Sequence, residues 1–304
     1  MASGPILHTK MKEPSVPVKS LVLVPLGGLC NRLRAMLSAL SLARDCQVPL
    51  EIVWFRDEGL NARYDDLFLP FSIPEELQSL YASVTLTEST SWCRYGVARK
   101  RNLWLPTLYQ RCAFDTILTE KPLLAMLAQG LPVKELSETV RGCLHGRVLI
   151  QTGFSFYPSD DSLFTRFFRP AAAVEALIEQ RRSMITPHTV GIHIRQTDNA
   201  QSIAHSPLNA FEAAMRVDIE RDPAATFYVA TDNPSLLRVL EACFPICYST
   251  ASPSRSSVVG MQEAVAELWT LMSCPRFHGS YWSSFSDTVV ALSPHGDIIF
   301  KPES

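Results

Sequence analysis

"KSLVLVPLGGLCNRLRAMLSALSLARDCQVPLEIVWF", residues 19 to 55, is the stretch that decides the fold class. It begins with an apolar, β-branched run, residues 19–26, that stops at Gly27-Gly28 and is typical of an interior strand. Apolar residues then recur at spacings of three and four, which predicts an amphipathic helix, and residues 49–55 predict a second strand. This order of strand, glycine loop, helix and strand is a βαβ unit, so we expect a parallel sheet with helices on its faces.

The second half of the chain repeats the alternation of helices and strands more clearly. It predicts helices at 171–185, 207–221, 234–243 and 258–273, and strands at "TVGIHI" (189–194) and "TFYVATD" (226–232). The weaker pattern between 57 and 150 predicts helices near 75–82, 106–118 and 121–142 and a strand near 147–152. Residues 153–170, which are aromatic and rich in Pro, Ser and Asp, are typical of an interdomain segment. We therefore expect two α/β domains, residues 1–160 and 161–304.

The composition excludes several function classes. The 304 residues are 47% apolar and carry a formal net charge of -2, which gives no global attraction to nucleic acid or to an anionic membrane. The first twenty residues lack the apolar core of a signal peptide, and no stretch approaches the ~20 apolar residues of a membrane span. The eight cysteines are scattered without C-x-x-C or zinc spacing. We expect a cytosolic protein with free thiols, no transmembrane segment, no structural metal and no nucleic-acid partner.

Four polar clusters fall at the ends of predicted strands. They are "LGGLCNR" (26–32), "HIRQTDN" (193–199), "YVATDN" (228–233) and "GSYWSSFSD" (279–287). In open parallel sheets ligands bind outside the carboxyl ends of the strands, where helix N-termini point free N–H groups at a shared crevice. The sequence lacks both the G-x-G-x-x-G fingerprint and the G-x-x-x-x-G-K-[ST] loop, which disfavours a nicotinamide enzyme and a P-loop NTPase.

Arg195 is the main candidate for binding an anion, because its guanidinium is a planar fork of donors that fits a phosphate or a carboxylate. The alternative is an ion pair with Asp198 that only fastens a loop. Ser283 and Ser284 precede an apolar helical run, and hydroxyls with unpaired amides at a helix start can hold phosphate. Ordinary N-capping is the alternative for these serines.

The other candidates are weaker when each is taken alone. After the first strand, Gly28 lets a ligand approach the backbone while Asn31 and Arg32 offer donors. Asp232 is as typical of a turn and helix cap as of a site. Glu267 can accept from both N–H groups of the guanine edge, and its alternative is a solvated helix face.

In this order and spacing the four clusters resemble the GDP-fucose-dependent fucosyltransferase superfamily. The segments "GGLCNRLRAMLSAL", "GLNARYDDLFLP", "HIRQTDN" and "GMQEAVAELWTLMSCPRFHGSYWSSFS" are similar to bacterial fucosyltransferase-like proteins that open with a GG-x-x-NR-x-RA signature. The resemblance implies a GT-B fold, with two Rossmann-like parallel-sheet domains facing across a cleft. It implies that the C-terminal domain holds the nucleotide sugar, that the N-terminal domain takes the acceptor, and that transfer is inverting, with no metal or cofactor.

The resemblance also implies roles for individual residues. Arg195 binds the β-phosphate, His193 lies against the nucleoside, and Glu267 reads guanine. Asp232 shapes the donor site, and the remaining donor contacts come from Gly28, Asn31, Arg32, Ser280, Ser283 and Ser284. The candidates for the catalytic base are Asp198 and His205, with Asp57 a third choice; His205 is equally typical of an ordinary loop histidine. Many members of the superfamily carry a second arginine where Gln196 stands, but strand alternation places position 196 on the face away from Arg195.

We therefore expect a glycosyltransferase that moves fucose, or a related deoxyhexose, from GDP to a glycan or a lipid-linked saccharide. The alternatives are a transferase that uses another nucleotide sugar, and a non-catalytic relative that binds nucleotide or glycan and in which Gln196 marks the loss of activity.

Overall fold

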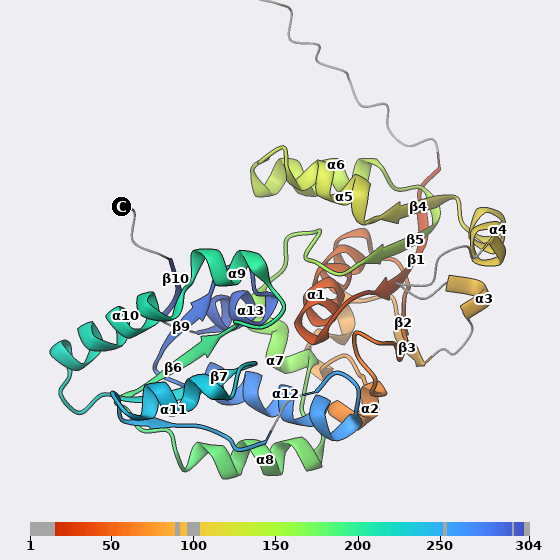
Figure 1. The fold of residues 1–304 in the computed structure, drawn as a ribbon. Helices are drawn as coiled ribbons and strands as arrows, with labels where there is room; N and C mark the ends of the chain where they lie inside the picture. Colours follow the sequence, from red (N-terminus) through yellow and green to blue (C-terminus); the bar gives the residue numbers. More distant parts are fainter. Residues whose placement is uncertain (1–15, 89–91, 96–103, 252–253, 294, 301–304) are drawn as a thin grey trace, which may run out of the picture.

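The computed structural model describes residues 16–88, 92–95, 104–251, 254–293 and 295–300 and shows two five-stranded parallel sheets (Figure 1). The strands of the first sheet are β1 (Val18–Pro25), β2 (Leu50–Trp54), β3 (Val84–Glu88), β4 (Thr116–Thr119) and β5 (Gly146–Thr152). The strands of the second are β6 (Thr189–Ile194), β7 (Thr226–Thr231), β8 (Ile246–Cys247), β9 (Arg276–Ser280) and β10 (Gly296–Ile299). The α/β class with two parallel sheets is as the sequence predicts.

Helices join the strands and cover both faces of each sheet. Those of the first half are α1 (Leu29–Cys46), α2 (Tyr64–Leu67), α3 (Trp92–Tyr95), α4 (Trp104–Ala113), α5 (Glu120–Leu127) and α6 (Val133–Gly142), with the 3-10 turn η1 (Glu75–Leu80). The connection between the halves contains η2 (Asp161–Leu163) and α7 (Phe164–Phe167). The second half adds α8 (Ala172–Arg182), α9 (Ala200–His205), α10 (Leu208–Arg221), α11 (Ser235–Glu241), α12 (Val258–Met272) and α13 (Ser284–Leu292).

The β1 to α1 turn needs a glycine at its first position. Gly27 has a φ of +79°, and a Cβ there would lie 2.9 Å from the Asn31 amide nitrogen. The turn lets α1 pack back onto the sheet, and 13 of its 18 residues are buried. A helix buried on nearly all sides has no exposed face for polar groups to occupy.

In each sheet, the direction in which successive strands are added reverses next to the first strand. The strand orders are β3-β2-β1-β5-β4 and β10-β9-β6-β7-β8, so the chain reverses between β1 and β5 and again between β6 and β9. In open α/β sheets, such a reversal separates the loops on its two sides and leaves a crevice at the strands' carboxyl ends. Three of the four predicted clusters flank these two points, and "YVATDN" follows the adjacent strand β7.

The two halves share apolar core rather than meeting through a thin linker. One continuous cluster of buried residues includes Leu21 of β1 together with Phe277 of β9. The ring of Phe68, after α2, lies 5.9 Å from that of Trp269 in α12, and α1 packs beside α13 (Figure 1). The arrangement holds the carboxyl ends of both sheets near one another. The predicted boundary near residue 160 lies in the connection between β5 and β6.

The region between 57 and 150 is where the secondary structure departs most from prediction. The predicted helix 121–142 is two helices, because Gly130 has a φ of +62° and Pro132 precedes α6. The predicted helix 106–118 stops at Ala113 and gives way to β4, and residues 84–88 form β3. The later elements that the sequence does not predict include α9, β8 and β10. No helix among the described residues is long and apolar enough to cross a membrane.

Candidate active site

A cleft of about 1440 Å³ lies between the two halves at the carboxyl ends of the sheets. The first half contributes Gly27, Gly28, Asn31 and Arg34 from the β1–α1 turn, and Glu58, Glu120, Gly153 and Phe154 from later loops. The second half contributes residues after β6, β7 and β9, together with the segment that leads into α12. Both of the points at which the strand order reverses therefore open into the same cleft.

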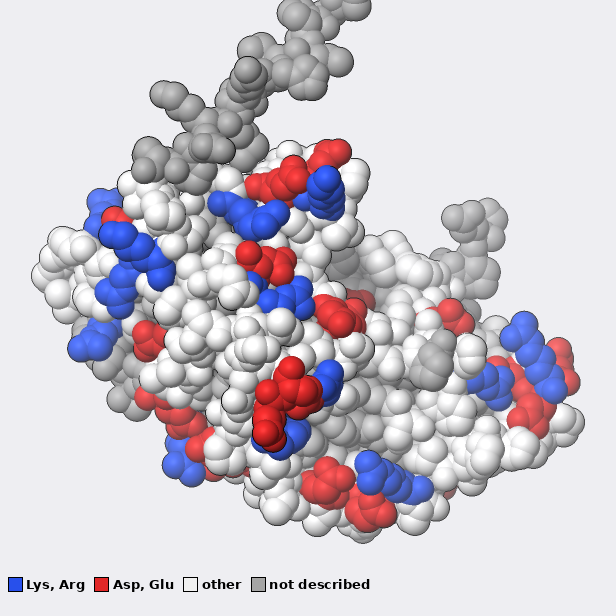
Figure 2. All heavy atoms as spheres, turned by 180° about the vertical axis from the view of Figure 1, so that it is seen from behind, with Lys and Arg blue, Asp and Glu red and all other residues white. Residues whose placement is uncertain are grey.

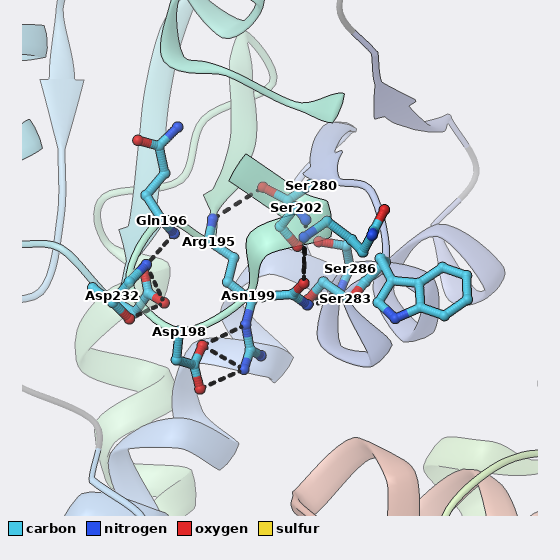
Figure 3. A network of polar contacts seen from close by, with 12 residues as sticks. Arg195, Gln196, Asp198, Asn199, Ser202, Asp232, Ser280, Ser283 and Ser286 are labelled. Carbon is cyan, nitrogen blue, oxygen red and sulfur yellow. Dashed lines mark hydrogen bonds and ion pairs between the residues drawn. The ribbon is translucent and has the colours of Figure 1, made fainter. Parts of the chain in front are cut away.

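Arg195 lies directly after β6, with its guanidinium at the cleft and its side chain 21% exposed. It makes a fork-on-fork ion pair with Asp198 (Figure 3), in which Nε donates to Oδ1 at 3.0 Å and Nη2 donates to Oδ1 and Oδ2 at 2.8 and 3.0 Å. The ion pair proposed as the alternative role of Arg195 is therefore present. Because Asp198 is itself 55% exposed, a bound anion can compete for the same guanidinium.

The loop that carries Arg195 is fixed by two further side chains. Asp232, after β7, accepts from the backbone N–H groups of Gln196 at 2.7 Å and Thr197 at 3.3 Å, and from the Thr197 hydroxyl at 2.6 Å (Figure 3). The Ser280 hydroxyl accepts from the Arg195 N–H at 3.0 Å and donates to the His193 carbonyl at 3.2 Å. These contacts position the backbone before any ligand binds.

Gln196 does not line the cleft. Figure 3 shows its side chain extending away from the Arg195 guanidinium, as strand alternation predicts. The Gln196 side chain therefore does not contact the space in front of the Arg195 guanidinium.

His193 lines the cleft as a neutral ring. Its Nδ1 lies 2.8 Å from the Ser286 hydroxyl, and its ring stacks on Phe285 with centroids 4.8 Å apart. Burial, together with the nearby Arg195 charge, lowers the pKa of His193 to about 4. The absence of a Cβ at Gly279 allows the close approach of α13, since a Cβ there would lie 2.6 Å from that of Ser286.

The serines at the start of α13 have different environments. Ser284 lines the cleft, whereas Ser283 is 1% exposed and its hydroxyl caps the helix by accepting from the Ser286 N–H. Ser280 is fully buried between the ends of β6 and β9. Of the three serines expected to contact the donor, only Ser284 is at the cleft surface, because the other two hydroxyls are used to fix the backbone.

Glu267 reaches the cleft from α12 rather than from a solvated face. It is 7% exposed and accepts from the Tyr228 hydroxyl at 2.9 and 3.2 Å. Burial raises the pKa of this carboxyl to about 7. The positive charge of Arg181 acts against this rise, and the cleft lining also includes the apolar residues Val229, Ala230, Leu237, Met261 and Ala264.

The contribution of the β1–α1 turn differs from the prediction at one residue. Gly28 and Asn31 line the cleft, but Arg32 is fully buried and does not. Its guanidinium donates to the carbonyls of Gly27 and Phe55 and pairs with Asp57 at 2.8 Å. Arg32 therefore does not reach the cleft, contrary to the prediction, and it holds the turn and the Asp57 loop together. Arg34, two residues later in α1, lines the cleft instead.

Structures of two kinds of protein match this architecture over nearly its whole length. NodZ α-1,6-fucosyltransferase, in a crystal soaked with GDP-fucose, matches with a TM-score of 0.61 and 14% identity over 91% of this chain and 93% of that one. POFUT1 in complex with GDP matches with a TM-score of 0.52 and 11% identity over 92% and 96% of the two chains. This chain therefore has a GT-B fold, the fold of these two enzymes. No protein-family model and no curated protein matches the sequence.

Several residues that line the cleft were not found from the sequence. Arg255, in the loop before α12, lies over the β1–α1 turn, with its Nε 4.0 Å from where a Gly28 Cβ would be, and its carbonyl accepts from the Asn61 N–H. Arg34 pairs with Asp287 of α13 at 3.2 Å across the halves. The serine-rich stretch around Arg255 carries no strand or helix period, so only its composition could have drawn attention to it.

The three candidate bases occupy different positions. Asp198 lines the cleft but is paired with Arg195. His205 is exposed on α9, where it packs edge-on against Tyr281 and does not line the cleft. Asp57 is tied to Arg32 and to two backbone N–H groups, whereas its neighbour Glu58 lines the cleft from the first half. Within the described part of the chain no group of three or more His, Cys, Asp or Glu residues is arranged to hold a metal ion.

Charged side chains on the face seen in Figure 2 alternate in sign rather than forming one basic or acidic field. Positive charge is instead available inside the cleft, where Arg34, Arg195, Arg238 and Arg255 belong to the lining.

Proposed function

We propose that this protein is an inverting glycosyltransferase that moves fucose from GDP-fucose to a saccharide acceptor. The observation that carries the proposal is the position of Arg195: a guanidinium on a fixed loop beside the start of α13, at the strand-order reversal of a fucosyltransferase fold. Departure of fucose places negative charge on the diphosphate, and preorganised donors aimed at that charge are the largest single source of such catalysis.

The diphosphate is proposed to bind between Arg195, Ser284 and the amides at the start of α13. In the free protein Asp198 occupies the guanidinium fork, so it serves as a placeholder that keeps Arg195 oriented. When phosphate replaces Asp198 as the partner of Arg195, one charge-assisted ion pair replaces another. The free-energy cost of breaking the Arg195–Asp198 pair is small because the pair lies at the surface of the cleft. Arg255 and Asn31 approach the same space from the side of the β1–α1 turn.

The guanine base is proposed to bind beside Glu267, which would accept from the ring N–H and the exocyclic amine. A uracil, a cytosine or an adenine lacks that pair of adjacent donors. The Tyr228 hydroxyl fixes the carboxylate in place.

The acceptor hydroxyl must attack the sugar from the side opposite the diphosphate, and its proton must leave to a base on that side. Because Asp198 pairs with Arg195, we propose that it lies on the diphosphate side and is not the base. Glu58 faces the cleft from the other half, and we propose it as the base. In the step, the acceptor oxygen bonds to the fucosyl carbon as the carbon–phosphate oxygen bond breaks, the proton passes to Glu58, and GDP leaves.

The decisive experiment is calorimetric titration of the protein, in buffer containing EDTA, with GDP, UDP, ADP and CMP. We expect binding of GDP alone or far more tightly than the others, with no need for a divalent ion because guanidinium groups supply the positive charge. Preference for another nucleotide would favour a transferase with a different donor. Binding of GDP without release of GDP from GDP-fucose, over a panel of saccharides, would identify a non-catalytic binder.

Arg195→Ala should lower the rate of fucosyl transfer by about 100-fold or more, the usual cost of removing one donor from a developing anion. Arg216→Ala is the matched control, since Arg216 lies on α10 outside the cleft, is 57% exposed and forms its ion pair with Glu212 of the same helix. Equal circular dichroism spectra and melting temperatures of the two variants would show that the fold is intact. A near-normal transfer rate in Arg195→Ala would refute the phosphate role.

The location is proposed from the cysteines. Cys30 and Cys274 are buried free thiols in the structure, which suits the reducing cytosol.

A further inference from the structure

Trp282 has a conformation that its local sequence does not explain. It stands between β9 and α13 with a φ of +55°, a region that residues with a Cβ rarely adopt, and its side chain is 64% exposed. It also lines the cleft. A large apolar side chain held in solvent on a strained backbone is unfavourable on both counts, and such positions concentrate at binding sites.

The backbone at Trp282 is held from both sides. Its carbonyl accepts from the Asn199 side-chain amide at 2.8 Å, and Asn199 also caps α9 by accepting from the N–H groups of Gln201 and Ser202. The Ser202 hydroxyl donates to the Tyr281 carbonyl at 2.6 Å. Figure 3 shows Asn199 and Ser202 close to the serines at the start of α13. The strain is thus imposed by α9, which the structure places against the β9–α13 turn.

Trp282 belongs to a cluster of partly exposed rings, which we call the aromatic ledge and define as Trp282, Tyr281, His205 and Phe300. The Tyr281 ring lies 5.8 Å from that of Trp282, 5.1 Å from His205 and 5.0 Å from Phe300, measured between centroids. Phe300 is 54% exposed. The ledge is continuous with the cleft, since Trp282 and Tyr281 line it.

An exposed tryptophan alone would carry no such argument, as Trp104 shows. It is 69% exposed on α4 but has an ordinary helical backbone and does not line the cleft. Isolated apolar side chains on a surface are normal. Trp282 differs because it is part of a ring cluster, its backbone is strained, and it is continuous with the cleft.

We propose that the aromatic ledge is the subsite for the acceptor saccharide, with the indole of Trp282 stacked on the apolar C–H face of a pyranose ring. This rests on the proposed function, and it adds a second, C-terminal side to acceptor binding. Aromatic rings present an electron-rich face that attracts polarised C–H groups, and a sugar ring combines such a face with a rim of hydroxyls.

The test is binding to an immobilised saccharide array in the presence of GDP, with wild type, Trp282→Gly, Trp282→Phe and Trp104→Gly. Glycine is used because it adopts a φ of +55° without strain, so this substitution removes the ring and leaves the turn relaxed. We expect wild type and Trp104→Gly to retain the same saccharides, Trp282→Phe to retain them more weakly, and Trp282→Gly to lose at least about tenfold in affinity.

One further readout separates this proposal from the proposed function. GDP affinity by calorimetry should be equal in wild type and Trp282→Gly, because the residues proposed to hold GDP, among them Arg195, Ser284 and Glu267, are unchanged. Unchanged saccharide binding in Trp282→Gly overturns the ledge, and so does a wild type that binds GDP but no saccharide on the array. Failure of wild type to bind GDP overturns the proposed function instead.

Discussion

The two carboxylates Asp198 and Glu58 are proposed to have different roles in the cleft: Asp198 pairs with Arg195, and Glu58 is the base. Asp198→Asn should tighten GDP binding by about twofold to fivefold, because it removes a charge that competes for the guanidinium at a partly exposed site.

Glu58→Gln should leave GDP binding unchanged and lower the transfer rate by about 100-fold, the usual contribution of a positioned base. Calorimetry measures the GDP affinity of each variant, and initial rates measure its fucosyl transfer.

The two variants serve as controls for each other, since each exchanges one cleft carboxylate for its isosteric amide. A 100-fold loss of rate in Asp198→Asn, with Glu58→Gln near normal, would reverse the assignment and return the role of base to Asp198.

Glu267 should make GDP binding depend on pH. Guanine needs the ionised carboxylate, and burial raises the pKa of that group to about 7, so at lower pH the free protein must lose a proton before it binds. The affinity for GDP should therefore rise about tenfold from pH 6 to pH 8 and level off above that. Glu267→Gln should bind GDP weakly with a flatter pH profile, which also subtracts the titration of the nucleotide's own phosphate. Identical profiles in the two proteins would contradict the contact with guanine.

The positions of Arg195 and Arg32 were not equally predictable from the sequence. Arg195 follows a strand whose alternating apolar residues fix its position, so its place at the sheet's carboxyl edge could be inferred. Arg32 lies in a helix that is buried on nearly all sides, and no periodic pattern distinguishes a buried arginine from one on an exposed face. Its partners, Asp57 and the carbonyls of Gly27 and Phe55, come from separate loops that only the folded chain brings together.

At the scale of elements, two adjacent serines at the start of α13 have different roles: Ser283 caps the helix, and Ser284 is proposed to bind the ligand. Ser283→Ala removes the buried cap and should lower the free energy of unfolding by about 1 kcal/mol. Ser284→Ala should leave stability unchanged and weaken GDP binding by about tenfold, because a hydrogen bond to a charged group is lost. Urea unfolding and calorimetry on both variants provide the measurements. The opposite result would place Ser283 at the phosphate and contradict the orientation of the helix start.

Element length explains much of what the sequence did and did not reveal. The strands β1, β6 and β7 and the helices α1, α10 and α12 are long enough to display their apolar period, and the sequence predicts all of them. β4 and β10 have four residues each, too few for a period of two to show, and α9 is a six-residue helix stabilised mainly by its contacts with the β9–α13 turn. The short elements form by tertiary contacts, and α9 supports the aromatic ledge.

At the scale of the whole molecule, the two sheets are joined by buried apolar contact and by hydrogen bonds in several places. The Asn61 amide donates to the Ser256 carbonyl at 2.8 Å, and the Gln262 amide donates to the Asp66 carbonyl at 2.9 Å. The Arg34–Asp287 pair spans the same boundary. A large apolar interface of this kind couples domains, whereas small polar interfaces leave them free to move.

The coupling predicts that the chain unfolds in one transition rather than two. Phe68→Ala is the informative variant, because Phe68 belongs to the first half, is fully buried, and contacts Phe168 and Trp269. It should cost about 3–5 kcal/mol, as large-to-small changes in a core do, and it should lower the melting of both halves together. Differential scanning calorimetry should give one peak in wild type and one peak at lower temperature in the variant. Phe211→Ala, in the separate cluster between α10 and the second sheet, is the matched control for loss of a phenylalanine ring within one half. Two resolved peaks in wild type, or a variant in which only one half melts early, would mean that the halves are independent domains and that the cleft between them is free to open and close.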